Sequence, residues 1–454
     1  MLPLSRPDLS TCGPPNLPTG VQPTDCCPPY TSTVVDFKLP SPTEPLRVRP
    51  AAHLVDADYL AMYKKAVELM KALPDDDPRS FKQQANVHCA YCNSAYDQLA
   101  SRPLARRPQL VALLSLSPLL PLLQRAHTQE AHLQRHVRAA FLELGRAGWH
   151  ADPVDLHRHF VPLYDNLRNA NHQPPALVSL SFSGTKPPAQ QIQNNLQVMQ
   201  REIITGAATA QLFLGAAYRA GDQPDPGAGT VERESHSSVH WWTGDPTHKT
   251  EDMGAFYSAG RDPIFFAHHG NVDRMWYLWR GLGSTHQDFT DPDWLNSTFL
   301  FYDENAQLVR VRVQDCLDTD ALGYTYQDVD IRGSIERDCG QAGVREHDCE
   351  GGGGVGGGGS PDGEGPARAV RRVYRREELL PRAGPQASQF AGSFIELPHP
   401  SKKGSSTSMN TTVRFGISEL LRQIGAATDE TITVTLVPRN GTVQIGGLSI
   451  EFSE

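Results

Sequence analysis

The sequence contains no long hydrophobic run and no excess of positive charge. No stretch of eighteen consecutive apolar residues occurs in its 454 residues, so we expect no membrane-spanning helix. The 51 acidic residues outnumber the 42 basic ones, and the net charge of −9 argues against nucleic acid as a partner. The hydrophobic content of 39% is enough for a core, and the length allows two or three domains.

Cysteines and targeting signals are also scarce. Eight cysteines are too few for a disulfide-rich scaffold, although they fit two bridges in one arm of the chain. The first residues, MLPLSRPDLS, have neither the apolar core of a secretory signal nor a charged, Ser-rich transit segment. We therefore expect that this chain carries no transit peptide.

Two histidines four residues apart, His236 and His240, are the most informative feature. On a helix these positions lie one turn apart on the same face, so both rings can bind one metal ion. Most such pairs bind nothing, but the segment DPIFFAHHGNVDRMW (262–276) follows and carries His269. Asp273, one helical turn further on, is predicted to accept the second ring N–H of His269. Ligation by nitrogen alone suits copper, zinc, iron or nickel, so the spacing does not name the metal.

The segments ESHSSVHWWTGD (234–245) and MGAFYSAGRDPIFFAHHGNVDRMWYLW (253–279) resemble the copper-B half of plant polyphenol oxidases, the catechol oxidase and tyrosinase group. In that family three histidines hold each of two copper ions, and the pair uses dioxygen to oxidise o-diphenols to o-quinones. The resemblance implies that His236, His240 and His269 are the copper-B ligands. It also implies that small phenols and dioxygen are the partners.

Two further residues match positions with a role in the family. Phe256, thirteen residues before His269, matches the bulky residue that lies over copper A. Glu232 matches the acid that holds an active-site water. Ser237 and Trp241 follow the first two ligands, where the family varies between monophenol and diphenol activity, and they do not decide that preference.

The segments 9–40 and 82–98 resemble the disulfide arm and the first copper-A segment of the family. The resemblance implies two disulfides, Cys12–Cys27 and Cys26–Cys89. It further implies that His88 is the first copper-A ligand and that Cys92 forms a thioether with the second. Such bridges imply an oxidising compartment. The resemblance also implies a location in the plastid thylakoid lumen.

The same cysteines have an alternative interpretation. From spacing alone, Cys89 and Cys92 with His88 could form half of a zinc site, since Cys-x-x-Cys is a common metal-binding spacing. No second Cys-x-x-Cys follows, so we give zinc little weight.

Residues 101–160 lack the remainder of copper A, which in the family is a histidine before a tryptophan and a later Phe-x-x-x-His-Arg helix. Residues 101–150 hold twelve leucines, seven arginines and only two aromatic residues. Codons for residues 107–110, 114–120 and 141–145 can be chosen so that the next reading frame spells His-Ser-Trp, Phe-Pro-Phe-His-Arg and Trp-Asn-Trp-Asp. These are sequence motifs of the family, and they occur in the order found in the family. We hypothesise that two of the three copper-A histidines are absent because their codons are translated out of frame.

Two alternatives for this stretch stay open. Residues 109–146 could form a leucine-rich helix, although Pro118 and Pro121 would break its first half. Six other histidines could serve as substitute ligands, but we interpret them as incidental because none has the aromatic surroundings of the family: His127, His132, His136, His150, His157 and His159.

A second aberrant stretch begins after TYQDVDI (325–331). The run CEGGGGVGGGGSPDGEGPARAVRRV (349–373) is either an acidic family linker read in another frame or a genuine flexible glycine linker. Both interpretations predict disorder.

The resemblance implies a mainly α catalytic domain, built on a four-helix bundle around a dicopper site, and a C-terminal β-sandwich-like domain. Periodicity predicts helices at 53–72, 190–205, 236–242, 265–280 and 415–425. TITVTLVPRNGTVQIGGLSIEFSE (431–454), with its Asn-Gly turn, predicts β strands. We expect five parts: a disulfide arm (1–50), a copper domain (51–282, aberrant at 101–160), a middle segment (283–331), a disordered linker (332–385) and the β domain (386–454).

Two functions are compatible with these features. The first is an o-diphenol:oxygen oxidoreductase of the polyphenol oxidase type with copper as its cofactor. The second is a catalytically inactive relic that keeps only the copper-B half of the site. In either case the missing histidines predict that this chain binds at most one copper ion.

Overall fold

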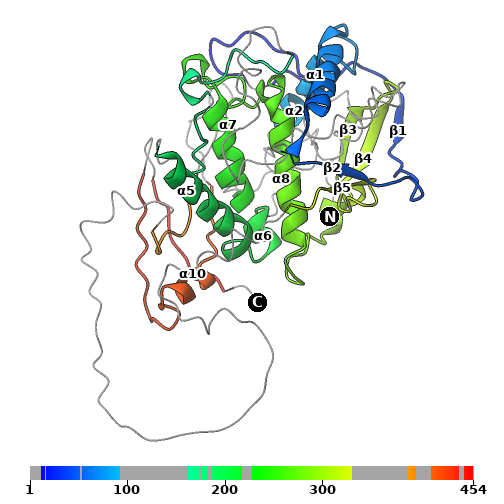
Figure 1. Cartoon of the computed structure of the whole chain (residues 1–454). Coiled ribbons are helices and arrows are strands. Elements are labelled where there is room, and N and C mark those ends of the chain that lie inside the picture. Colours follow the sequence, from blue (N-terminus) through cyan, green and yellow to red (C-terminus); the bar gives the residue numbers. More distant parts are fainter. Residues whose placement is uncertain are drawn as a thin grey trace, which may run out of the picture.

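The computed structural model describes residues 12–15, 17–51, 54–92, 162–173, 175–181, 186–216, 227–329, 387–394, 411–438 and 444–452. Helices form its centre, and two small sheets lie to one side of them (Figure 1). The aberrant segment 101–160 and the linker 332–385 lie outside the described residues. Among the helices that are described, none is both long enough and apolar enough to cross a lipid bilayer.

Helices α1 (Ala57–Ala72) and α2 (Phe81–Cys92) pack against each other. Helix α1 begins after Asp56, whose side chain accepts a hydrogen bond from the backbone N–H of Tyr59 at 2.8 Å. Its buried side chains recur every three or four residues, so the helix predicted at 53–72 is confirmed. Helix α2 is buried on almost every side, because α1 and the turn η8 (Ala259–Arg261) both pack against it.

Helix α5 (Pro188–Gln200) begins with a proline at its first position and runs into the π-turn η5 (Arg201–Thr205). The helix predicted at 190–205 is thus confirmed, with a widened last turn. The short helix α6 (Ala210–Phe213) follows.

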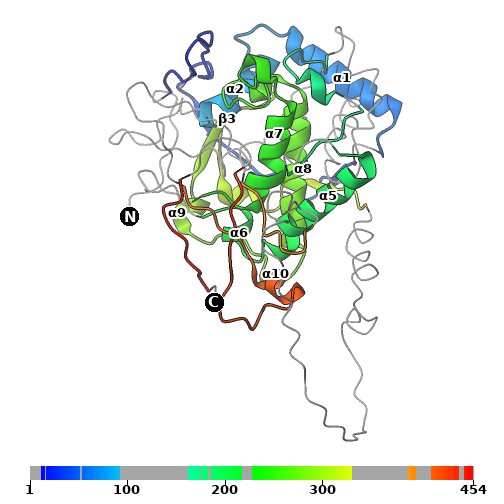
Figure 2. The ribbon, with the colours of Figure 1, turned by 90° about the vertical axis from the view of Figure 1, so that its left-hand side faces the viewer.

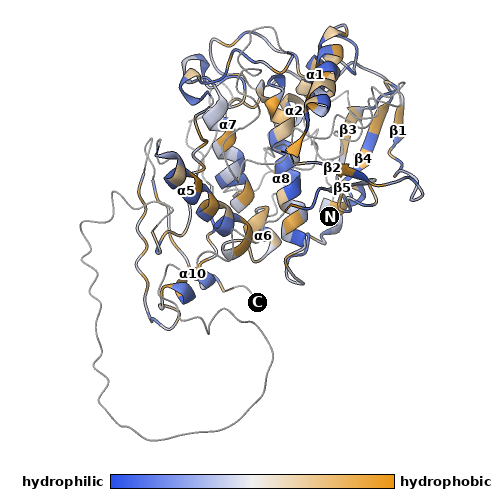
Figure 3. Cartoon of the chain, viewed as in Figure 1, coloured by the Kyte–Doolittle hydropathy of each residue, from blue (hydrophilic) through white to orange (hydrophobic). Residues whose placement is uncertain are grey.

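A second π-turn, η6 (Glu232–His236), continues directly into α7 (Ser237–Thr243). Helix α8 (Ile264–Arg280) runs beside α7 through the middle of the molecule, as Figures 1 and 2 both show. These elements confirm the helices predicted at 236–242 and 265–280. Twelve of the 17 residues of α8 are buried, yet Figure 3 shows polar colour along it. A buried helix that carries polar side chains must give each of them a partner or a ligand.

Five shorter elements complete the helical content of the described residues: η4 (Ala170–His172), η7 (Pro246–His248), α9 (Pro292–Leu295), η9 (Val313–Cys316) and α10 (Ser418–Gln423). Helix α10 confirms the helix predicted at 415–425.

The strands form two small sheets. In the first, β4 (Leu308–Arg312) pairs in parallel with β1 (Val34–Asp36) and antiparallel with β3 (Thr298–Tyr302), with Val34 opposite Leu308 and Thr298 opposite Arg312. All five residues of β3 are buried. In the second, β2 (Arg47–Arg49) pairs in parallel with β5 (Tyr324–Tyr326). Both sheets therefore join the N-terminal arm to the segment that follows α8.

The C-terminal part contacts the helices through two aromatic side chains. The guanidinium carbon of Arg201 lies 4.6 Å from the ring centroid of Phe390, and that of Arg233 lies 4.3 Å from the centroid of Phe415. Both distances fit cation–π contacts. These contacts seat the C-terminal part on the two π-turns.

The β-sandwich-like domain predicted for the C-terminus is not confirmed. Residues 431–438 and 444–452 are described, and no strand forms within them. Alternation determines which side chains share a face, but a strand also needs a neighbouring strand to complete its backbone hydrogen bonds. Leu448, Ile450 and Phe452, which alternate, are all exposed.

A buried ion pair ties the N-terminal arm to α8. The Nη1 atom of Arg49, in β2, lies 3.0 Å from Oδ2 of Asp273, and both side chains are almost fully buried. The hydroxyl of Tyr324 donates to the same oxygen at 2.8 Å, and the Arg49 guanidinium lies 3.5 Å from the Tyr324 ring centroid. Tyr326 also donates to Asp273. Arg49 is thus neutralised by Asp273 and enclosed by two aromatic rings.

Replacing Asp273 tests this tie. We expect Asp273→Ala to lower the free energy of unfolding by about 3–5 kcal/mol, because removing one partner leaves the other charge buried without compensation. The matched control is Asp36→Ala, since Asp36 is 81% exposed and lies 3.4 Å from Arg310; its effect should stay below about 1 kcal/mol. Urea unfolding followed by tryptophan fluorescence measures both. Equal losses in the two variants would contradict the assignment.

Candidate metal centre

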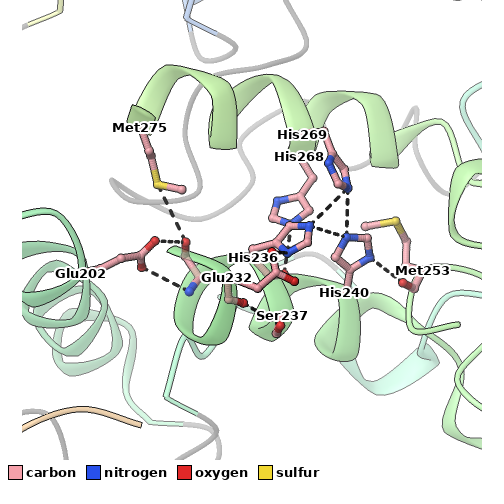
Figure 4. Close-up of polar contacts among 10 residues, drawn as sticks. Glu202, Glu232, His236, Ser237, His240, Met253, His268, His269 and Met275 are labelled. Atoms are coloured by element: carbon pink, nitrogen blue, oxygen red, sulfur yellow. Dashed lines mark hydrogen bonds and ion pairs between the residues drawn. The ribbon is translucent and has the colours of Figure 1, made fainter. Parts of the chain in front are cut away.

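Three buried histidines converge where η6, α7 and α8 meet (Figure 4). His236 ends η6, His240 lies one turn further on in α7, and His269 lies in α8. The Nε2 atom of His240 is 3.1 Å from Nε2 of both other rings, and those two atoms are 3.4 Å apart. No side chain of the three is more than slightly exposed. The prediction that these three residues come together is therefore confirmed, and their ring nitrogens form a triangle.

The size of the triangle fits one metal ion. A metal–imidazole bond is about 2.0 Å long, so near-tetrahedral ligands on one ion stand roughly 3.3 Å apart. The three observed separations, 3.1, 3.1 and 3.4 Å, bracket that value. The three Nε2 atoms could therefore hold a single copper or zinc ion without rearrangement.

A backbone partner leaves Nε2 available on His240, and a carboxylate lies beside Nδ1 of His236. His240 Nδ1 lies 2.6 Å from the carbonyl oxygen of Met253 and donates to it. His236 Nδ1 lies 2.9 Å from Oε2 of Glu232. A proton held at Nδ1 leaves a lone pair at Nε2, the form that binds a metal.

The surroundings also keep the imidazoles of His240 and His269 neutral. Burial, followed by the proximity of His236 and the other rings, lowers the pKa of His240 well below its ordinary value. The same causes lower the pKa of His269. Since protons are disfavoured here, a metal cation meets little competition for these nitrogens.

The role predicted for Asp273 is wrong. Asp273 lies one turn beyond His269, but its carboxylate turns to Arg49, Tyr324 and Tyr326. His269 Nδ1 is buried and has no hydrogen-bond partner among the described residues. Helical spacing placed the two residues on one face, but the buried Arg49 charge attracts the carboxylate more strongly than a neutral ring does.

His268 lies beside the triangle and is a less suitable ligand. Ring nitrogens of His236, His240 and His268 all lie within 4.8 Å of one another. However, His268 Nε2 lies 3.0 Å from the carbonyl oxygen of His236 and donates to it. The tighter separations of His269 make it the better third ligand.

His88 in α2 faces the triangle from the other side. Its ring centroid lies 6.0 Å from that of His269 and 6.4 Å from that of His240. Its Nδ1 lies 2.9 Å from the carbonyl oxygen of Phe256, and burial lowers its pKa to about 3. The ring of Phe256 stands nearly parallel to it at 6.4 Å. His88 and Phe256 thus occupy the side on which copper A is expected.

Both predicted disulfides form, and they join the arm to α2. Cys12 bonds to Cys27 and Cys26 bonds to Cys89, with Cα–Cα distances of 5.8 and 5.5 Å. Cys89 follows His88, so the second bridge holds the arm against the metal centre. Cys92 is a buried thiol whose pKa is raised by burial and by Glu232. Its expected thioether partner falls in 101–160, outside the described residues.

The sequence did not reveal which groups orient the rings. Met253 and Phe256 belong to one loop, and their carbonyls serve His240 and His88 respectively. Any residue has a carbonyl oxygen, so no side-chain pattern marks these acceptors. The loop therefore connects the two halves of the site.

Models of three protein domains match the chain. They are the common central domain of tyrosinase at residues 155–282, the polyphenol oxidase middle domain at 288–334, and the chloroplastic polyphenol oxidase C-terminal domain at 373–452. The chain is 43% identical to a chloroplastic polyphenol oxidase of Malus domestica, over 99% of this chain and 85% of that protein. It belongs to the plant polyphenol oxidase family. Tyrosinase-family polyphenol oxidases are oxidoreductases with a pair of copper ions.

Two further relatives support the assignment to the polyphenol oxidase family. It is 42% identical to a chloroplastic polyphenol oxidase of Vitis vinifera, over 99% of the chain and 82% of that protein. It is 39% identical to an aureusidin synthase of Antirrhinum majus, over 99% of the chain and 89% of that protein.

Solved structures of the family share its fold. Latent apple tyrosinase matches with 41% identity and a TM-score of 0.71, over 88% of this chain and 95% of that one. Latent aurone synthase matches with 30% identity and a TM-score of 0.77, over 94% of both chains. The helical catalytic domain expected from the sequence is thus the fold of this family.

Single replacements identify the third ligand. We expect His236→Ala, His240→Ala and His269→Ala each to weaken copper binding by more than about 100-fold, because even residues outside the ligand set cost roughly 10–100-fold. His268→Ala, which loses only the bond to the His236 carbonyl, should cost roughly 10-fold. Competition with a chelator of known affinity measures all four. The assignment would be reversed if His269→Ala bound copper normally and His268→Ala did not.

Proposed function

We propose that this chain is built to oxidise o-diphenols to o-quinones with dioxygen at a pair of copper ions. The convergence of three Nε2 atoms, with His88 about 6 Å from them ring to ring, carries the proposal. The family relationship supports copper rather than zinc at these nitrogens. In the overall reaction two o-diphenols lose four electrons and four protons, and one dioxygen becomes two waters.

In this proposal His236, His240 and His269 hold copper B, and His88 holds copper A. Copper would supply the redox chemistry that passes electrons from phenol to dioxygen. The carbonyl of Met253 holds the Nδ1 proton of His240 and so presents its Nε2 lone pair inward, and the Glu232 carboxylate lies 2.9 Å from Nδ1 of His236. The role of Glu232 in holding a water stays a prediction.

Phe256 would limit how a phenol approaches. Its ring lies beside His88, and its backbone oxygen already holds that imidazole. A bulky ring in this place would restrict access to the metal centre. The preference between monophenols and diphenols is not part of the proposal.

The completeness of copper A is the second question. The tyrosinase match begins at residue 155 and so does not include His88 or most of 101–160. Residues 101–150 contain none of the copper-A sequence motifs of the family. We therefore keep the hypothesis that this chain binds at most one copper ion, although its relatives do not favour the alternative of an inactive relic.

Several relatives are named chloroplastic, among them the Malus domestica and Vitis vinifera proteins. We infer a plastid location for this protein, and within the plastid we propose the thylakoid lumen. The two disulfides support an oxidising compartment.

The four-helix bundle, the C-terminal β domain and the five-part division of the chain belong to the same proposal.

Two forms of the protein test function and completeness separately. One is the printed chain, and the other has residues 101–160 replaced by the corresponding segment of the Malus domestica relative. We expect the printed chain to bind at most one copper ion and to show negligible catechol oxidation. The repaired chain should bind two and form o-quinone, measured by elemental analysis and by absorbance of the quinone.

The two outcomes that contradict these expectations are distinct. Two copper ions and normal turnover in the printed chain would refute the frame-slip hypothesis while supporting the function. A repaired chain that folds and binds two copper ions but leaves catechol unchanged would refute the proposed function.

A further inference from the structure

A buried carboxyl group from η5 forms hydrogen bonds to η6, the turn that ends at His236. The backbone N–H of Ser235 donates to Oε2 of Glu202 at 3.2 Å, and the Ser235 hydroxyl donates to Oε1 at 2.5 Å. Glu202 is fully buried, and Ser235 is almost so. Figure 4 shows Glu202 reaching toward the turn that carries Glu232 and His236. One side chain thus accepts from both hydrogen-bond donors of the residue that precedes His236.

The same residue also holds the start of that turn. The Thr230 hydroxyl donates to the backbone oxygen of Glu202 at 2.6 Å. On the far side, the Ser235 hydroxyl lies 3.8 Å from the sulfur of Met275 in α8. Glu202 therefore brackets η6 at Thr230 and Ser235, and Ser235 links η5, η6 and α8.

A π-turn is less regular than an α-helix and needs such support. π-Turns are rare and often lie at functional sites, and η6 ends at His236 itself. The direction of the His236 ring depends on the width of this turn, because the side chain leaves the backbone at its last residue. A displacement of about 1 Å is enough to spoil a constellation of ligands.

Burying the carboxyl group of Glu202 is costly. Burial raises its pKa well above the ordinary value, and nearby Glu234 adds to this. A buried carboxyl group is unfavourable unless its hydrogen bonds compensate for lost water. The bonds that it makes go to the residues that shape η6.

We propose that Glu202 is a positioning residue of the metal centre, which sets the shape of η6 through Ser235 and thereby aims His236 at His240 and His269. It does not touch the metal or the substrate. The inference rests on the proposed function, since it assumes that the three histidines bind one ion.

Cobalt(II) titration of the full-length, metal-free chain tests the proposal, because the visible spectrum of cobalt reports its coordination geometry. Glu202→Ala loses both hydrogen bonds to Ser235, and we expect cobalt affinity to fall by roughly 10–100-fold with an altered spectrum. Glu202→Gln keeps an oxygen acceptor for one of them and should fall between wild type and Glu202→Ala. Ser235→Ala keeps the backbone N–H bond and should also be intermediate.

The matched control is Glu68→Ala, which removes a half-exposed glutamate of α1 that lies 3.2 Å from Lys65. It should leave cobalt binding unchanged. Should Glu202→Ala fail to fold, the ordering of Glu202→Gln and Ser235→Ala against wild type decides. The proposal is overturned if these variants unfold at lower temperature but bind cobalt with wild-type affinity and spectrum, because Glu202 would then be only structural. An absence of catechol oxidation in the repaired chain, with this ordering intact, would refute the proposed function and not this inference.

Discussion

The structure depends on burying three imidazoles with their Nε2 atoms facing one another. Three lone pairs at 3.1 to 3.4 Å repel unless a cation or protons lie between them. Burial disfavours protonation, so the arrangement is matched to a metal ion. The surrounding protein holds the rings in this arrangement. The loop carbonyl of Met253 accepts from His240, the Glu232 carboxylate lies beside His236, and Glu202 supports η6.

Two long-range ties bring the chain around this centre. The Cys26–Cys89 bond closes a separation of 63 residues and holds the arm on α2, beside His88. The Arg49–Asp273 ion pair spans 224 residues and holds the same arm on α8, one turn from His269. Closing such loops is entropically unfavourable, and a covalent bond and a buried, aromatic-enclosed charge are both strong enough to compensate. The N-terminal arm is thus part of the scaffold that supports the helices of His88 and His269.

The sequence revealed the parts of the site that depend on side-chain spacing and on resemblance. His236 and His240 follow from helical periodicity, and the disulfides follow from the family pattern; the structure confirms that all of these residues meet their partners. The partner of Asp273 could not be predicted this way. Periodicity indicates that two residues share a helix face, but not that an arginine 224 residues away competes for one of them. The C-terminal strands show the same limit, because alternation predicts a face and not the neighbouring strand.

The groups that orient the rings were hidden for a different reason. The acceptors at Met253 and Phe256 are backbone atoms, and their function depends on the path of the loop rather than on side-chain identity. Glu202 was hidden because an acidic residue in an amphipathic pattern normally indicates a solvated face. Only the three-dimensional contacts show that it is buried.

The two halves of the site differ in how far they depend on the rest of the chain. The three copper-B candidates lie between residues 236 and 269, within one continuous described segment, and Glu202 supports that segment from η5. That half can form whenever η5, η6, α7 and α8 pack. We propose that His88 in α2 belongs to copper A and that its other ligands would come from 101–160, which lies outside the described residues. Under that proposal, a change confined to 101–160 would remove the second metal without altering the disulfide cysteines or the copper-B candidates. Family membership and catalytic competence are therefore separate properties of this chain, because they depend on different segments of it.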